Sequence, residues 1–288
     1  ALGEQESAVE KLIYLSKDDT FDTRSEATVA LGELGDASEK IASLLVSLLQ
    51  DDNSDLYFSA VWALGKLGNS SENVITILLS FLNDDDTDLC YFAAESLVNL
   101  GYTSEEVVRA LILILQLDEP DTSDYANETL VKIGNSSELV NSVLLSMLYD
   151  DNSGERYSAA WALGRLGIAS EQAVIALISC LKDKDSNVRS SVAEALGRLS
   201  NTSEQVVIAL ISCLKDEDSD VRYSAAEALG ELGIASEQVI TALVSRLEDE
   251  SSSVRYNAAW ALGRLGNTSE QVVIALISCL KDEDSDVR

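Results

Sequence analysis

The stretch NTSEQVVIALISCLKDEDSDVR occurs twice without change, at residues 201–222 and at residues 267–288. A Leu-Gly or Leu-Val pair marks a 33-residue period along the whole chain, and its second residue falls at Gly32, Gly65, Val98, Val131, Gly164, Gly197, Gly230 and Gly263. The two identical stretches start two such periods apart. Self-similarity at a fixed period of this length is typical of a stacked repeat array.

Each unit predicts two helices, which we name A and B. Helix A is predicted over residues 219–233, SDVRYSAAEALGELG, where apolar residues recur at helical spacing: Val221, Ala225, Ala228, Leu229 and Leu232. Asp218 or Ser219 can cap its start, and Gly233 can end it in a left-handed conformation. Helix B is predicted over residues 236–247, with an apolar face of Val239, Ile240, Leu243, Val244 and Leu247.

Neither helix can bury its apolar face alone, but antiparallel pairs that stack on one another can. The sequence therefore predicts an all-α fold, a right-handed α-solenoid of antiparallel helix pairs with a 33-residue repeat. We expect nine B helices, the first beginning near Gln5, and eight complete A helices. Ala1-Leu2-Gly3 is interpreted as the tail of a helix A, and a ninth helix A is expected to start at Asp286. Residues 1–288 form a single array of about eight and a half repeats in this interpretation, a segment of a longer protein.

The amino-acid composition argues against several classes of function. The chain carries 50 acidic and 20 basic residues, a net charge of −30, which repels nucleic acid and anionic membranes. It has no histidine, so a nucleophile–histidine pair or a histidine metal site is excluded. The acidic turns, such as residues 84–86, lack a calcium-loop pattern and are interpreted as helix caps. We therefore expect no catalytic residue, no metal and no cofactor.

The four cysteines predict free thiols in a reducing compartment. Cys180, Cys213 and Cys279 occupy one position in their units, and such positions in successive units are roughly 10 Å apart, too far for a disulfide. The residues at the same position in the other units are mostly apolar, so packing is favoured over covalent attachment of a chromophore.

No apolar run reaches the length of a membrane span and no targeting segment is visible, so a cytoplasmic location is expected.

The segments VRYSAAEALGELG at residues 221–233 and ALISCLKDED at residues 209–218 resemble HEAT-like repeats of the class named for phycobilisome lyases. The resemblance covers essentially the whole chain. It implies an α-solenoid whose B helices line the concave side. It also implies a ladder between neighbouring units, formed by an Asp after helix B and an Arg early in helix A. The matching positions are Asp150 and Arg156, Asp183 and Arg189, Asp216 and Arg222, and Asp249 and Arg255.

The ladder pattern is interrupted in repeats two to four. Tyr57, Cys90 and Ser123 replace the Arg, and Leu117 replaces an Asp. Val98 and Val131 also replace the marker glycine in this part of the chain. We expect the array to be least regular around residues 84–134.

Two sets of side chains are predicted to bind a partner. The first is a ribbon on the helix-B face, where small hydroxyls alternate with isolated apolar and cationic residues: Arg109, Leu113, Tyr149, Ile175, Ser179, Lys182, Gln205, Ile208, Ser212, Lys215, Thr241, Ile274 and Ser278. The second consists of aromatic pairs with i,i+4 spacing on helix A, which recur in every third repeat: Phe58 with Trp62, Tyr157 with Trp161, and Tyr256 with Trp260. Each pair is interpreted either as a binding hot spot or as packing within its helix or against the adjacent repeat.

The sequence thus favours a non-catalytic protein-binding scaffold that recognises a protein or peptide, preferentially a basic one, on its concave helix-B surface. Two alternatives come from the resemblance. One is the ligand-sensing repeat array of a cytosolic signalling NTPase, whose motor would lie elsewhere because no phosphate-binding loop is present. The other is a phycobilin lyase-like protein that handles a chromophore. End-to-end self-association through uncapped termini is also possible.

Overall fold

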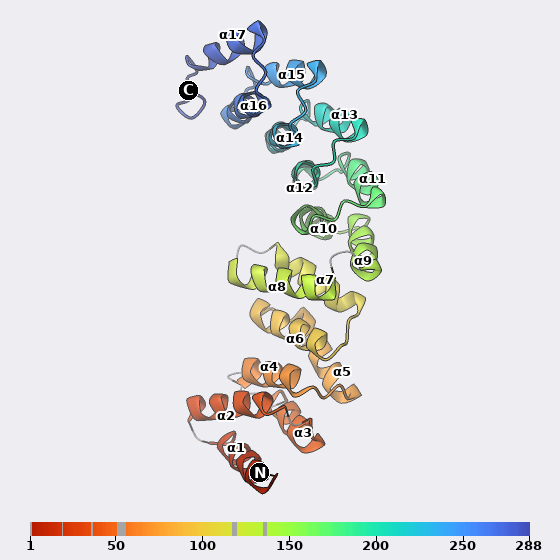
Figure 1. Cartoon of the computed structure of the whole chain (residues 1–288), viewed down its shortest axis with the longest axis vertical. Helices are drawn as coiled ribbons and strands as arrows, with labels where there is room; N and C mark the ends of the chain where they lie inside the picture. The colour runs from red at the N-terminus through yellow and green to blue at the C-terminus, as the bar shows by residue number, and fades with distance from the viewer. Residues whose placement is uncertain (1, 19, 36, 51–55, 117–119, 135–136) are drawn as a thin grey trace. The chain divides into compact units, whose positions relative to one another are not determined.

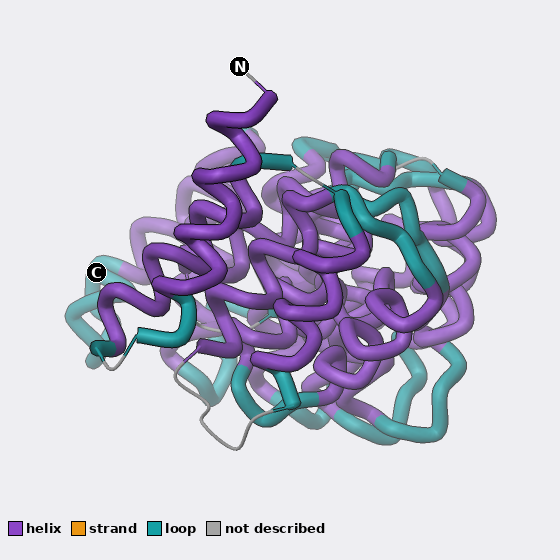
Figure 2. Tube along the Cα trace, turned by 90° about the horizontal axis from the view of Figure 1, so that it is seen from below, coloured by secondary structure: helices purple, strands orange, loops and turns teal. Residues whose placement is uncertain are grey.

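The computed structural model describes residues 2–18, 20–35, 37–50, 56–116, 120–134 and 137–288, with side chains from Ser7 onward except those of Pro120 and Asp121. Leu117 lies outside the described residues. Within them the chain forms α-helices and no strand (Figures 1 and 2). Contacts divide the chain into two compact units, unit 1, Ala1–Val140, and unit 2, Asn141–Arg288. The prediction of an all-α solenoid is confirmed.

The described helices alternate between the two predicted types. The B helices are α1 (Leu2–Leu15), α3 (Glu39–Leu48), α5 (Glu72–Ser80), α7 (Glu105–Leu115), α9 (Glu138–Leu148), α11 (Glu171–Cys180), α13 (Glu204–Cys213), α15 (Glu237–Val244) and α17 (Glu270–Cys279). A short 3₁₀ helix, η2 (Phe81–Asn83), follows α5. The A helices are α2 (Phe21–Glu33), α4 (Tyr57–Leu67), α6 (Thr87–Asn99), α8 (Pro120–Ile133), α10 (Ser153–Leu166), α12 (Ser186–Arg198), α14 (Ser219–Leu232) and α16 (Ser252–Leu265).

The helix ends follow the predicted capping chemistry. The Asp218 carboxylate accepts a hydrogen bond from the Asp220 N–H at the start of α14, and Gly233 ends that helix with φ of 69°. Helix α15 ends at Val244, three residues before the predicted end, because the N–H groups of Arg246 and Leu247 bond carbonyls three residues back and tighten the last turn.

One boundary prediction is wrong. The sequence pattern assigns the first three residues to the tail of a helix A, but Leu2 and Gly3 are part of the B helix α1. Once a helix has nucleated, adding one more turn costs little, so the helix that was expected to start near Gln5 extends backwards to Leu2.

Successive A helices pack through the marker glycines. A Cβ placed on Gly197 of α12 would lie 2.8 Å from the Cα of Ala228 in α14, closer than real Cβ atoms approach. Gly164 meets Ala195 and Gly230 meets Ala261 in the same way, and the contact recurs in unit 1 between Gly32 and Ala63. The missing side chain lets the helix axes approach closely, which explains why glycine recurs at this position.

This packing determines which helices line the inner side of unit 2. Its A helices pack closely against one another, whereas its B helices touch sparingly. An array bends toward the side where its elements are closer together, so α10, α12, α14 and α16 lie inside the arc followed by α11, α13 and α15 (Figure 1). The expectation that B helices line the concave side is therefore wrong for unit 2, because the small Gly and Ala contact residues belong to helix A.

Unit 1 shows the predicted irregularity in its packing. Val98 stands in α6 where the A helices α2 and α4 carry Gly32 and Gly65. The packing of α6 on α8 is the sparsest between successive A helices of this unit. A branched side chain at this position holds two helices apart, since interhelical distance depends on the residues at the contact.

Candidate functional site

The Arg–Asp ladder of unit 2 fixes the turns that surround its surface sites. Nε and Nη2 of Arg156 donate to the two carboxylate oxygens of Asp183 at 2.6 and 2.8 Å, and Nη1 donates to the carbonyl oxygens of Asp150 and Asp151. The same geometry recurs from Arg189 to Asp216, from Arg222 to Asp249 and from Arg255 to Asp282. Each arginine thus grips the turn of its own unit and the aspartate of the next, and the predicted ladder between units is confirmed.

Other contacts occupy the ladder positions of repeats two to four. Tyr57 stands at an arginine position, and its ring contacts that of Phe81 with centroids 5.7 Å apart. At the next two positions the Cys90 thiol donates to the Leu82 carbonyl, and the Ser123 hydroxyl donates to the Leu115 carbonyl. Aromatic packing and short local hydrogen bonds therefore replace charge in repeats two to four.

The predicted helix-B residues lie on the surface. Arg109 and Leu113 of α7 in unit 1 are half-buried, and the Arg109 guanidinium lies 3.5 Å from the Glu105 carboxylate. The others belong to unit 2 and are exposed: Tyr149, Ile175, Ser179, Lys182, Gln205, Ile208, Ser212, Lys215, Thr241, Ile274 and Ser278. These exposed side chains of the B face form what we call the outer ridge. Because the B helices occupy the outer side, their placement on a concave surface is corrected, while their role in binding stays a prediction.

The outer ridge combines exposed isoleucines with serines that bond their own helix. Ile175 and Ile208 are 56% and 51% exposed. The hydroxyl of Ser179 donates to the Ala176 carbonyl at 2.6 Å, and that of Ser212 donates to the Ile208 carbonyl. The hydroxyl hydrogens of these two serines are therefore already used within their own helices.

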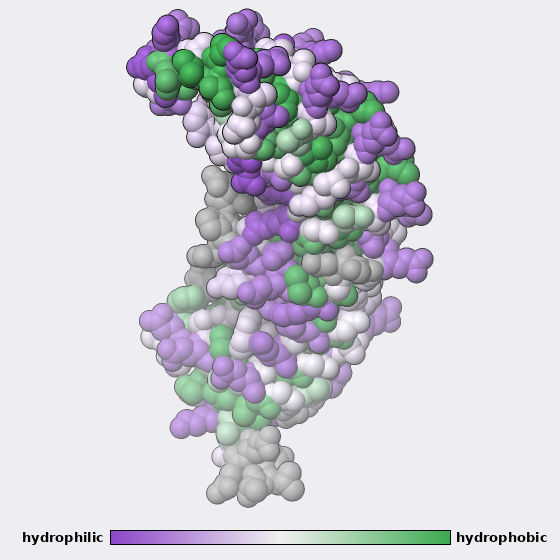
Figure 3. Space-filling model, turned by 45° about the horizontal axis from the view of Figure 1, so that its top comes forward, coloured by the Kyte–Doolittle hydropathy of each residue, from purple (hydrophilic) through white to green (hydrophobic). Residues whose placement is uncertain are grey.

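Hydrophobic side chains are spread over the surface of unit 2 among hydrophilic ones. The upper part of Figure 3, where unit 2 lies, shows green hydrophobic groups interspersed with purple hydrophilic groups. Non-obligate protein interfaces are about as apolar as the rest of a protein surface, so this mixed character by itself does not mark a binding site.

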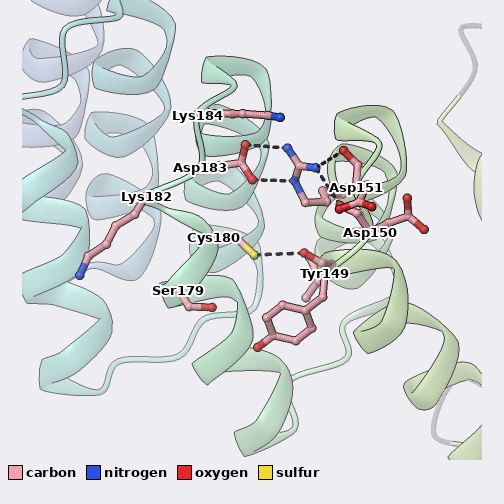
Figure 4. Close-up of a pocket in the computed structure, with 10 residues that line it drawn as sticks. Tyr149, Asp150, Asp151, Ser179, Cys180, Lys182, Asp183 and Lys184 are labelled. Carbon is pink, nitrogen blue, oxygen red and sulfur yellow. Dashed lines mark hydrogen bonds and ion pairs between the residues drawn. The ribbon is translucent and has the colours of Figure 1, made fainter.

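Three predicted residues of the outer ridge share one pocket. Tyr149, Ser179 and Lys182 line a cavity of about 430 Å³ at the first arginine rung, together with Lys184 and the ladder residue Asp183 (Figure 4). Its charges are mixed, and Arg156 at its wall is fully engaged by the ladder. The pocket is open and polar, so it suits a side chain of a partner better than a buried small molecule.

The inner face of unit 2 carries three rows of side chains from its A helices. The first row is Tyr157, Ser190, Tyr223 and Tyr256; the second is Trp161, Glu194, Glu227 and Trp260; the third is Arg165, Arg198, Glu231 and Arg264. All are exposed or half-buried. The four residues of the third row, with Gly164, Gly197 and Ser200, line a groove of about 490 Å³.

The sequence prediction found the aromatic members of this face but missed its charged members. The signal was present, since Glu194 and Glu227 occupy the tryptophan position at the 33-residue period. The inward position of helix A in unit 2 is what brings these glutamates onto the same face as the tryptophans.

Ring contacts of the aromatic residues differ from the predicted i,i+4 pairs. The guanidinium of Arg165 lies over the Trp161 ring at 5.0 Å, and Arg264 lies over Trp260 at the same distance. The Trp260 ring also packs against Gly230 of the adjacent repeat. In unit 1 Lys66 covers Trp62, while Phe58 contacts Phe92 edge-on. Part of each tryptophan therefore serves packing, and the half-buried remainder faces solvent.

The glutamates of the inner face are crowded. Burial, reinforced by the charges of Glu231 and Glu194, raises the pKa of the Glu227 carboxyl above its ordinary value. The charge of Glu194 also helps to raise the pKa values of Tyr157 and Tyr223, for which burial is the main cause. Charged and aromatic side chains of α10, α12 and α14 therefore lie close enough on this face for their charges to act on one another.

The cysteines are buried free thiols. Burial raises the pKa of Cys90 and of Cys213 to about 11, and raises those of Cys180 and Cys279 above the ordinary value. A thiol is nucleophilic as its thiolate, so these groups are poorly suited to hold a chromophore covalently.

The described residues also bear on metal binding and on membrane insertion. They contain no group of three or more Cys, Asp or Glu side chains arranged to hold a metal ion. None of their helices is long and apolar enough to cross a membrane.

Comparison with known families identifies the repeat. A model of HEAT repeats matches residues 9–98, 141–230 and 207–288, which together cover most of the chain. The chain belongs to the HEAT-repeat family. No curated protein matches the sequence of this HEAT-repeat chain.

Solved structures share the fold of this HEAT-repeat chain. The karyopherin Kap121p bound to the extreme C-terminus of the protein phosphatase Cdc14p is 15% identical, with a TM-score of 0.74 over 97% of this chain and 37% of that one. Another structure of Kap121p is 16% identical, with a TM-score of 0.69 over 98% and 36% of the two chains. The chain thus spans little more than a third of the karyopherin length, and the likeness is one of fold.

Proposed function

We propose that the chain is a non-catalytic scaffold that binds a protein or peptide on the inner face of unit 2. The observation that carries this proposal is that three tyrosines and two tryptophans on this face, Tyr157, Tyr223, Tyr256, Trp161 and Trp260, are half-buried or exposed, so each presents part of its ring to solvent. Aromatic residues are enriched among the residues that dominate binding energy. Close packing of the A helices brings the rows from four helices within reach of one ligand.

The karyopherin likeness supports a binding role of this kind, since that solenoid was solved with a peptide segment of another protein. The phycobilisome-lyase class of HEAT repeat and a cytoplasmic location remain proposals based on the sequence resemblance and composition. The buried thiols weigh against a covalent chromophore-handling role, and nothing in the described residues favours the NTPase sensor over a simple scaffold.

The outer ridge is a second candidate surface. Its isoleucines Ile175, Ile208 and Ile274 are 56%, 51% and 60% exposed, and Tyr149, which lines the ridge pocket, is 67% exposed. A partner there would contact helices that are more widely separated, so it would meet fewer residues at once.

Panning a displayed library of random 12-residue peptides on the folded chain tests the proposal. Enriched peptides are then measured by fluorescence anisotropy against two variants, Trp161→Ala with Trp260→Ala on the inner face, and Ile175→Ser with Ile208→Ser on the outer ridge. We expect the inner variant to bind at least tenfold more weakly and the outer variant to bind as the original does.

Two outcomes contradict this. Loss of binding only in the outer variant moves the site to the outer ridge, and absence of any enriched peptide overturns the scaffold proposal. Because removal of tryptophan can loosen the helices, circular dichroism accompanies each variant. Tyr256→Ala, at a side chain that is 44% exposed, provides a milder inner substitution.

A further inference from the structure

We propose that the inner face of unit 2 takes an extended peptide segment with a lysine or arginine near its middle and an apolar side chain toward each end. This inference rests on the proposed function and names the partner chemistry of the same face. It is carried by the order of charges and rings across α10, α12, α14 and α16.

The centre of the face is negative. The Arg198 guanidinium lies 2.5 Å from the Glu194 carboxylate within α12, so that pair is neutral. Glu227 and Glu231 on α14 have no ion-pair partner within the part of the chain that the structure describes. Glu227 is half-buried, and the charges of Glu231 and Glu194 outweigh the opposing charge of Arg198, so a cationic group from a ligand relieves the cost of its negative charge.

The two ends of the face have a different character. Arg165 stacks on Trp161 at the α10 end, and Arg264 stacks on Trp260 at the α16 end. Each arginine covers part of its indole and leaves the half-buried remainder of the ring for an apolar side chain, and the Arg264 charge also repels a basic one. The arrangement therefore favours a basic group at the centre and an apolar side chain at each end, which gives the ligand a register.

Spacing between the two tryptophans sets the length of the ligand. Three helix-to-helix steps separate α10 from α16, and packed helices lie about 8–10 Å apart, so the rings are roughly 25–30 Å apart. An extended chain advances about 3.3 Å per residue. Eight or nine residues then reach from one tryptophan to the other, with the basic side chain about halfway.

Charge complementarity indicates which kind of partner fits the inner face of unit 2. The chain as a whole has a net charge of −30, which attracts a basic segment and repels phosphate-bearing ligands. A second copy of this acidic chain fits the centre of the face poorly for the same reason. A partner segment with one or two lysines or arginines between apolar residues meets both the charge and the spacing.

A double comparison of peptide and protein tests this inference, using the 12-residue peptides enriched by panning as the probe. Each is also synthesised with its lysine or arginine replaced by glutamine, and binding is measured by fluorescence anisotropy. The protein variants are Glu227→Gln with Glu231→Gln on the inner face, and Glu204→Gln with Glu237→Gln on exposed B-helix positions as the charge-matched control.

We expect enriched peptides to carry a basic residue, and the inner-face variant to bind them at least tenfold more weakly, while the control variant binds within twofold of the original. The glutamine peptides should lose a similar factor on the original protein and almost nothing on the inner-face variant. Peptides that bind equally to the original and inner-face proteins overturn this inference but leave the scaffold proposal in place. A complete absence of binding peptides overturns the scaffold proposal and this inference with it.

Discussion

Arg222 on α14 holds Asp249, 27 residues further along the chain, with two parallel hydrogen bonds of 2.9 and 2.7 Å. Only 5% of the arginine side chain and 3% of the aspartate side chain are exposed. A planar guanidinium and a carboxylate match in this geometry, which makes the pair directional as well as charged. One side chain therefore joins two adjacent repeats and fixes the turn between them.

Replacing Asp249 by asparagine should destabilise the chain by about 3 kcal/mol, because the buried Arg222 charge then keeps only the exposed Glu250 carboxylate, 3.3 Å away, as a counterion. Urea unfolding followed by tryptophan fluorescence measures the loss. Glu248→Gln, an exposed change in the same turn, is the control and should stay within about 0.5 kcal/mol of the original. Equal behaviour of the two variants contradicts a structural role for the ladder.

The same pair predicts a pH dependence. Burial works to raise the pKa of Asp249, but hydrogen bonds from Arg222 and the Ser251 N–H, with the charges of Arg222 and Arg246, bring it below the ordinary value. A carboxyl with a lowered folded-state pKa stabilises the fold above its unfolded pKa of about 3.9, and this contribution is lost as pH falls through the folded value.

The difference in unfolding free energy between the original chain and Asp249→Asn should therefore be constant from pH 7 to about pH 5 and shrink below about pH 4. Urea titrations at a series of pH values give this difference directly. A difference that does not change down to pH 3 is inconsistent with a titrating ladder aspartate.

Gly197 and Gly263 offer a matched test of helix packing. Gly197→Ala should destabilise the chain by about 1–3 kcal/mol, because its Cβ would press on Ala228. Gly263 occupies the same position in α16, and a Cβ placed on it would meet no atom within 4 Å, so Gly263→Ala should stabilise by about 0.5–1 kcal/mol through helix propensity alone. Thermal unfolding of both variants measures these changes in stability. Destabilisation of the same size at both positions would refute the packing argument.

The thiols should react slowly in the folded chain. With the pKa of Cys90 and Cys213 raised to about 11, their thiolate fraction at pH 8 is about two orders of magnitude below that of an ordinary cysteine. Labelling with a coloured disulfide reagent at pH 8 should be correspondingly slower than in urea. Fast labelling of a single cysteine in the native chain would identify a reactive thiol that the buried positions do not explain.

Amide hydrogen exchange should reveal the irregular part of unit 1. Exchange is expected to be faster in α6 and α8 than in α12 and α14, because sparse packing and the absence of arginine rungs lower the cost of local opening. Equal protection in both pairs of helices would show that the aromatic and hydroxyl contacts of repeats two to four replace the ladder in full.

Much of this molecule can be predicted from its sequence because short-range chemistry repeats. The 33-residue period predicts the alternation of A and B helices, Asp218 and Gly233 predict the ends of α14, and the Asp and Arg positions predict the ladder. These features depend on a few residues that lie close together in the chain, where caps, turns and helical spacing act.

Only the tertiary structure decided which aspartate each ladder arginine bonds and which helices lie on the inner side of unit 2. Arg222 bonds the aspartate of the following repeat while it grips the backbone of its own turn at Asp216, a choice that depends on how the repeats stack. The inward position of helix A in unit 2 depends on how closely Gly197 and Ala228 let two helices approach. Periodicity shows which residues share a helix face, but curvature follows from distances between helices, and those distances exist only after the side chains have packed.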